Sequence, residues 1–277
     1  MNIESNQSVT SQPSMSESQI EDVTSSTWKY IRTQYASYII IYICICFVVI
    51  YLIPNQFTIY LLIMIAFWGY SVASKKVKSE FTKEFGKSIG FTYGEDTSPE
   101  TVVGKLFKTG HSQSLSDVLT GVYKDIPIRI FTFCFTIGYG KNSHTYLYTV
   151  FEATLLGKVP DILLFSNKHT SAVTDWFSGD ETIILEGDFN KYFKLRVPKG
   201  YEQEAYEIFT PDVMTQLIDR ASDLSFEFVA NKLYIYATKV ITKRDDMKNI
   251  FDLSEYLIGL FNKNTANIDI MSATHAN

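Results

Sequence analysis

Cysteine is scarce in this sequence, and none of it is arranged to bind a metal or to build a disulfide framework. The 277 residues contain three cysteines, Cys44, Cys46 and Cys134, and no CxxC pair. A disulfide-rich secreted domain and a thiolate zinc site are therefore excluded. We expect no cofactor and no metal centre in this chain.

Positive charge is also in short supply. Lysine and arginine total 25 against 30 aspartates and glutamates, which gives a formal net charge of -5. A protein that holds nucleic acid through bulk electrostatics needs the opposite balance. Nucleic acid is therefore not an expected partner.

The short motifs of common catalytic sites are missing too. The sequence has no G-x-S-x-G turn and no HxxxH pair. The Gly138-Tyr-Gly140-Lys141 segment is not a phosphate loop, because Phe135 stands where the first glycine is needed. Catalytic groups can be scattered along a chain, so the question of an enzyme stays open, and the pattern favours a non-enzyme.

No charged residue occurs between Arg32 and Lys75, and this long gap is the strongest feature present. Pro54-Asn55-Gln56 interrupts the gap once and supplies a polar turn. As helices, the pieces at about 34–53 and 57–74 would each be roughly 30 Å long, which matches the hydrocarbon core of a bilayer. The sequence predicts a transmembrane helical hairpin over 29–78, with the lipid bilayer as a partner; two buried helices of a soluble core are the alternative.

The flanks of the hairpin give its orientation. Lys29 and Arg32 precede the first span, and Lys75, Lys76 and Lys78 follow the second. The positive-inside rule places both ends in the cytoplasm. We therefore expect a multi-pass protein of the plasma membrane with both termini cytoplasmic.

The rest of the chain divides by composition. Residues 1–28 are rich in serine and contain four acids but no lysine or arginine, which predicts a disordered polar tail. Residues 79–262 have the composition of a folded cytosolic domain, and 263–277 are expected to be a frayed tail.

Within the domain, strands come in runs instead of alternating with helices. This order predicts an α+β fold with a mainly antiparallel sheet and flanking helices. The candidate strands are 115–122, 126–137, 144–155, 160–166, 182–187, 191–197, 224–230 and 232–238. The candidate helices are one between Ser98 and Gly110, then 201–209, one that begins at Thr210-Pro211-Asp212, and about 246–262.

One strand pairing can be specified residue by residue. Strands 126–137 and 144–155 are expected to pair antiparallel, with Phe135 opposite Tyr146. This register also places Arg129 opposite Glu152, an opposite-charge pair that a shift of two residues would lose.

Five acids crowd into residues 175–188, and they raise the question of a carboxylate site. They are Asp175, Asp180, Glu181, Glu186 and Asp188. A solvated loop is the simpler interpretation, because calcium-loop spacing is absent. The candidate ligand or turn residues are Asp188, Asn190, Glu186, His144 and Lys141. Asp188 and Asn190 flank Phe189, where their oxygens can accept hydrogen bonds from the backbone of a turn.

A recognisable pattern of residues begins at Glu186. It consists of Asp188-Phe189-Asn190, Phe193, Ala205, Ile208-Phe209-Thr210-Pro211, Met214, Leu217 and the hairpin 224–237. With this pattern the chain resembles a bacterial family catalogued as domain of unknown function 3137. The match is fair over about 180–240 and looser over 110–165. The resemblance implies a bacterial membrane protein with an N-terminal pair of spans and a cytosolic domain, and it brings no catalytic residues with it.

Together these features predict a membrane-anchored protein whose cytosolic domain binds or scaffolds something at the inner face of the membrane. Two alternatives stay open. One is a membrane-anchored hydrolase that uses the acidic cluster 175–188. The other is an accessory subunit of a larger membrane complex, with an integral-membrane protein as the partner.

Overall fold

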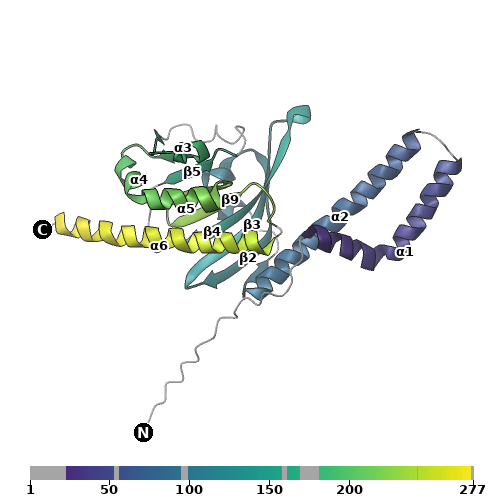
Figure 1. Ribbon diagram of the computed structural model, residues 1–277, viewed down its shortest axis with the longest axis horizontal. Coiled ribbons are helices and arrows are strands. Elements are labelled where there is room, and N and C mark those ends of the chain that lie inside the picture. The colour runs from purple at the N-terminus through teal and green to yellow at the C-terminus, as the bar shows by residue number, and fades with distance from the viewer. Residues whose placement is uncertain are drawn as a thin grey trace, which may run out of the picture.

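The computed structural model describes residues 23–52, 56–94, 99–157, 161–168, 181–241 and 243–275. Most of the predicted polar tail and the acids Asp175 and Asp180 lie outside these residues. The described chain is an α+β protein with one large antiparallel sheet and flanking helices, as the sequence predicts (Figure 1).

Two long helices precede the sheet. Helix α1 spans Val23–Leu52 and helix α2 spans Gln56–Ser88. They contact each other, and the Tyr42 hydroxyl donates a hydrogen bond of 2.6 Å to the carbonyl oxygen of Leu62. Helix α1 begins earlier than the end of the predicted tail, since no proline or glycine occurs between Pro13 and Pro54 and a helix elongates more easily than it nucleates.

In the described residues, nine strands form one sheet, and every pairing between them is antiparallel. The strands are β1 (Thr92–Gly94), β2 (His111–Tyr123), β3 (Ile126–Ile137), β4 (His144–Thr154), β5 (Ile162–Ser166), β6 (Glu181–Ile183), β7 (Phe193–Val197), β8 (Leu224–Val229) and β9 (Lys232–Ala237). Their order across the sheet is β1-β2-β3-β4-β9-β8-β5-β7-β6. Dense β-branched and aromatic residues in these segments favour this state.

The predicted register between β3 and β4 is confirmed. Phe135 lies opposite Tyr146, and Arg129 lies opposite Glu152. The two charged side chains meet, with Arg129 Nη2 2.6 Å from Glu152 Oε2. The late hairpin is confirmed as well, since β8 and β9 pair around Ala230, which has a φ of +57°.

Helices cover one face of the sheet and bury the main core. They are α3 (Phe189–Tyr192), α4 (Glu202–Ile208), α5 (Pro211–Ala221) and α6 (Arg244–His275) (Figure 1). Helix α6 continues past 262, where the sequence predicts its end, and no proline or glycine follows Gly259 to stop it.

Phe251 of α6 is the residue that joins three parts of this core. The centroid of its ring lies 6.3 Å from the ring centroid of Phe85 in α2. The centroids of the Tyr123 ring in β2 and the Phe151 ring in β4 are each 5.2 Å away. The end of α2 is thereby packed into the domain, against both the sheet and α6.

A short connecting segment covers part of the opposite face of the sheet. The sequence predicts one helix between Ser98 and Gly110, and this prediction is wrong. The structure has two separate 3-10 turns, η1 (Pro99–Thr101) and η2 (Lys105–Lys108). The ring centroid of Phe107 in η2 lies 4.9 Å from that of Phe133 and 5.2 Å from that of Tyr234. The packing of this ring against the sheet outweighs the local preference for a helix that begins at Ser98-Pro99.

Candidate functional site

The N-terminal helices expose many large apolar side chains. These side chains are Ile40, Ile41, Ile43, Ile45, Val48, Tyr51, Phe57, Ile59, Tyr60, Leu61, Ile63, Met64, Ile65, Phe67, Trp68 and Val72. We call this set the apolar surface of α1 and α2. Soluble proteins seldom expose apolar patches of this extent, and such patches mark membrane or protein contacts.

Helix α2 is long and apolar enough to cross a membrane, judged by its length and composition. Its environment changes along its length without a break in the helix. Up to Val72 most of its large apolar side chains are exposed, whereas Val77, Phe81 and Phe85 are buried at four-residue spacing. Spacing of four residues places these side chains on one face of the helix. The first half of α2 thus presents apolar side chains outward, and the second half packs on the folded domain.

Glu227 is the most deeply buried acid among the described residues, with 2% of its surface exposed. Its Oε2 accepts a hydrogen bond of 2.5 Å from the Tyr236 hydroxyl, and its Oε1 accepts one of 2.7 Å from the backbone N–H of Lys105. Burial raises the pKa of the Glu227 carboxyl, and these two hydrogen bonds act in the opposite direction. Burial and the neighbouring Glu227 also raise the pKa of Tyr236.

Gly104 makes this contact possible. A Cβ atom at that position would lie 2.6 Å from the Tyr236 hydroxyl and 2.8 Å from Glu227 Oε2. Only a residue without a side chain lets the backbone approach so closely. Glu227 therefore acts as an anchor that holds the segment around η2 on the sheet.

A second acid, Glu152, is buried on the same face. It pairs with Arg129 and with Lys232, whose Nζ lies 3.0 Å from Glu152 Oε1. Arg129 also donates to the side chain and the carbonyl oxygen of Thr101 in η1. The two buried acids thus hold both 3-10 turns on the sheet. This structural role accounts for the burial of Glu152 and Glu227 without a catalytic function.

The residues singled out from the sequence do not converge. Glu186 and Asp188 are exposed, and Asp188 pairs with Lys191 on the surface at 2.8 Å. Lys141 and His144 are exposed at the turn between β3 and β4, whereas Glu186 follows the edge strand β6. The side chain of Glu181 is outside the described set, as are Asp175 and Asp180. Among described residues, no group of three or more His, Cys, Asp or Glu could hold a metal ion.

Asn190 has a clear structural role. Its Oδ1 accepts a hydrogen bond of 3.2 Å from the backbone N–H of Leu185, and its Nδ2 donates to the carbonyl oxygen of the same residue. This pair of bonds closes the turn in front of the buried Phe189. Asn190 is thus a turn residue, one of the two roles that the sequence suggests for it.

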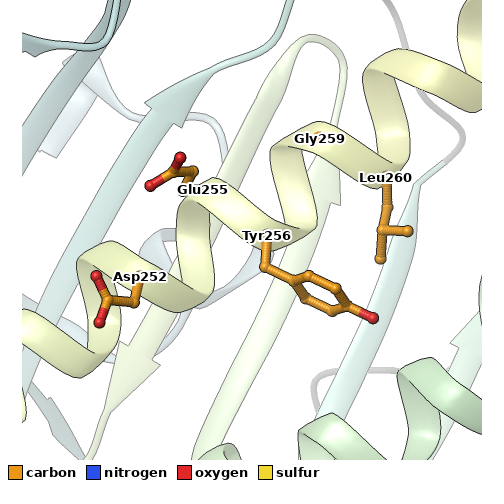
Figure 2. Close-up of a pocket in the computed structure, with 5 residues that line it drawn as sticks. All are labelled: Asp252, Glu255, Tyr256, Gly259 and Leu260. Carbon is orange, nitrogen blue, oxygen red and sulfur yellow. The ribbon is translucent and has the colours of Figure 1, made fainter.

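A shallow hollow of about 490 Å³ lies along α6. Figure 2 shows its lining residues Asp252, Glu255, Tyr256, Gly259 and Leu260, which all come from this one helix. Glu255 already pairs with Lys124 of the β2–β3 turn. The hollow therefore gathers no set of groups from different elements, as a catalytic site would.

The comparisons with known proteins place the fold. No family model matches the chain, and no curated protein matches it at a significant level. A solved structure does match, that of the mycobacterial trehalose monomycolate transport factor A, TtfA. The TM-score is 0.50 at 12% sequence identity, and the match covers 67% of this chain and 93% of that chain. At this identity the likeness shows a shared fold.

Proposed function

We propose that this protein is anchored in the membrane by α1 and α2, and that its α+β domain is a binding or scaffolding module held at the cytoplasmic face. The observation that carries the proposal is the apolar surface of α1 and α2. Large apolar side chains gain free energy when they leave water, at about 25 cal/mol per Å². A bilayer covers such a surface completely, and each helix satisfies its own backbone hydrogen bonds there.

The charges beside this surface support a hairpin with both ends in the cytoplasm. Lys75 and Lys76 are exposed just after the apolar half of α2, and Lys29 and Arg32 are exposed before the apolar part of α1. Basic residues next to a span favour the cytoplasmic side. The turn at 54–56 would then lie on the outer side.

The junction of α2 with the domain supports a scaffolding role. Because α2 is continuous and Phe85 packs against Phe251, the domain has a fixed orientation relative to the anchor. A rigid mounting suits a module that presents a surface to a partner beside the membrane. The solved structure of similar fold is that of a transport factor, and a membrane-associated role for this chain is consistent with that. Membership of the domain of unknown function 3137 family is part of the same proposal, and the residues from Asp188 to Leu217 support it.

Cysteine labelling in intact cells tests the anchor. Cys44, Cys46 and Cys134 are replaced by serine, and a single cysteine is introduced by Gln56→Cys or by Lys199→Cys. Gln56 is exposed at the start of α2, and Lys199 is exposed in the domain. An impermeant thiol reagent should label the first variant in intact cells and the second only after lysis.

Two results would contradict this proposal in different ways. Labelling of Lys199→Cys in intact cells would reverse the orientation. Recovery of the protein in the soluble fraction, with neither variant labelled from outside, would remove the anchor itself.

The hydrolase alternative gains no support from the described part of the acidic cluster. Glu186 and Asp188 are both exposed, whereas a catalytic acid with a tuned pKa is normally held in a cleft beside a second ionisable group. An accessory role in a larger complex stays open, since another membrane protein could cover part of the apolar surface of α1 and α2.

A further inference from the structure

The turn between β3 and β4 presents an aromatic side chain to solvent. Tyr139 is 81% exposed at the tip, whereas Phe133 and Phe135 on the strand that leads to it are fully buried. Lys141 and His144 are exposed on the same turn. An exposed tyrosine next to a lysine is the residue combination found where proteins meet the headgroup layer of a membrane.

Contacts with neighbouring residues hold this tip in place despite its exposure. The imidazole of His111 stacks on the Tyr139 ring, with centroids 4.7 Å apart and planes 10° apart, and its Nε2 lies 2.8 Å from the carbonyl oxygen of Gly138. Ser143 Oγ donates a hydrogen bond of 2.9 Å to the carbonyl oxygen of Gly140. Tyr139 is thus held in an outward position before any partner binds, which reduces the entropy lost on docking.

The charge around the tip has one sign. Between Arg129 and Glu152 the only charged residue is Lys141. The carboxylate on β4, Glu152, lies toward the other end of the hairpin, where it is buried and paired with Arg129 and Lys232. No carboxylate on the part of the hairpin between Arg129 and Glu152 therefore opposes an anionic surface. Near such a surface each basic residue contributes favourably, and the effect falls off within about 10 Å at moderate salt.

The direction of the tip agrees with its composition. In Figure 1 the β3–β4 turn projects from the sheet on the side toward which the first half of α2 also extends, while the β2–β3 turn lies at the opposite end of the sheet. Because α2 is continuous and fixed to the core at Phe85, this arrangement holds as a unit. The tip faces the side where the proposed membrane lies.

We propose that the β3–β4 tip is a second membrane contact, in which Tyr139 enters the interfacial layer and Lys141 Nζ pairs with the phosphate of an anionic lipid headgroup. The proposal rests on the proposed membrane anchor. The contact at the tip is separate from the anchoring helices. With both contacts the domain would lie against the bilayer, whereas with α2 alone it would be attached at one point.

Fluorescence quenching on the full-length protein in vesicles tests the contact. The three natural cysteines are replaced by serine, and a fluorophore is attached through Asn142→Cys at the tip or through Val122→Cys at the far end of β2. Both sites are exposed. The vesicles contain phosphatidylcholine and phosphatidylglycerol, with a nitroxide on a fraction of the headgroups. We expect several-fold stronger quenching at Asn142→Cys than at Val122→Cys.

Charge variants then test the chemistry of the contact. With the Asn142→Cys label, Lys141→Gln should reduce the ratio of docked to undocked tip about fivefold, the effect of roughly one basic residue at an anionic surface. Lys141→Arg should keep it, and vesicles of phosphatidylcholine alone should resemble Lys141→Gln. Tyr139→Ser should weaken docking in both vesicle types.

The outcomes separate this contact from the anchor. Equal quenching at Asn142→Cys and Val122→Cys, in protein that floats with the vesicles, would overturn the contact and leave the anchor intact. Protein that does not float with the vesicles would overturn the anchor and the contact together. Quenching that Lys141→Gln and Tyr139→Ser both leave unchanged would also refute the roles assigned to these residues.

Discussion

The hydroxyl of Tyr236 donates a hydrogen bond of 2.5 Å to the carboxylate of Glu227, diagonally across the β8–β9 hairpin. The other carboxylate oxygen accepts from the backbone N–H of Lys105, which belongs to η2. One buried acid therefore connects two strands to a segment far away in the sequence. The stability of that segment on the sheet depends on this carboxylate keeping both partners.

Removing the phenol should be costly at this position. In Tyr236→Phe, Glu227 Oε2 stays buried and loses its donor, so the free energy of unfolding should fall by about 1–3 kcal/mol. Denaturant unfolding of the detergent-solubilised protein measures the change. Tyr206→Phe is the control, because Tyr206 is exposed and its loss should leave stability unchanged. Equal stability of both variants would contradict the anchoring role.

Glu227 should also make stability depend on pH. Burial raises the pKa of its carboxyl in the folded protein above the ordinary value of 4.5. The folded state therefore binds this proton more tightly than the unfolded state. The resulting stabilisation is fully present below pH 4.5 and is lost as the pH rises through the folded pKa. The glutamine in Glu227→Gln does not titrate, so this variant does not lose that stabilisation. Its stability relative to the natural protein should therefore increase over the same rise in pH.

Unfolding curves of both proteins at a series of pH values provide the test. A constant difference across the series would show that the Glu227 pKa is the same in the folded and unfolded states. Asp219→Asn serves as a control for surface charge, since it removes one carboxylate from the exposed part of α5.

The sheet was more predictable than the sites. The β3–β4 register follows from the sequence because Arg129 and Glu152, and the aromatic pairs beside them, align in one register and not in its neighbours. The conformation of η1 and η2 does not follow, because it depends on Phe107 packing against Tyr234, a residue distant in sequence. Local cap residues carry no information about that contact.

The burial of Glu227 could have been inferred from its neighbours in the sequence, although not from its residue type. Glu227 stands between Phe226 and Phe228 in a predicted strand, and the hairpin pairing places it beside Tyr236. An acid between buried aromatics needs a hydrogen-bond donor. By contrast, Glu186 and Asp188 attract attention through their density in sequence, yet their exposed positions require no partner. The pattern around an acid was more informative than the number of acids.

Asn190 and Asp188 provide a matched pair for the turn before α3. In Asn190→Ala, both hydrogen bonds to Leu185 are lost, and we expect the free energy of unfolding to fall by about 1–3 kcal/mol. From the sequence, Asp188 is expected to stabilise the same turn, but its side chain makes no capping hydrogen bond and pairs with Lys191 at the surface. Asp188→Ala should therefore leave the melting temperature nearly unchanged. A larger effect for Asp188→Ala than for Asn190→Ala would be incompatible with these contacts.

Phe251 should control how firmly α2 is attached to the domain. Its ring contacts Phe85 of α2, Phe91, Tyr123 and Phe151, and 3% of its surface is exposed. Phe251→Ala leaves a cavity among these rings, which should cost about 3–5 kcal/mol of unfolding free energy. Because the cavity borders the end of α2, limited proteolysis should cut near residues 88–91 faster than in the natural protein. Phe209→Ala is the control, since Phe209 is equally buried but packs against Phe189 beside α5. It should lower stability without faster cleavage at 88–91, and faster cleavage there in both variants would mean that Phe251 has no special role in holding α2.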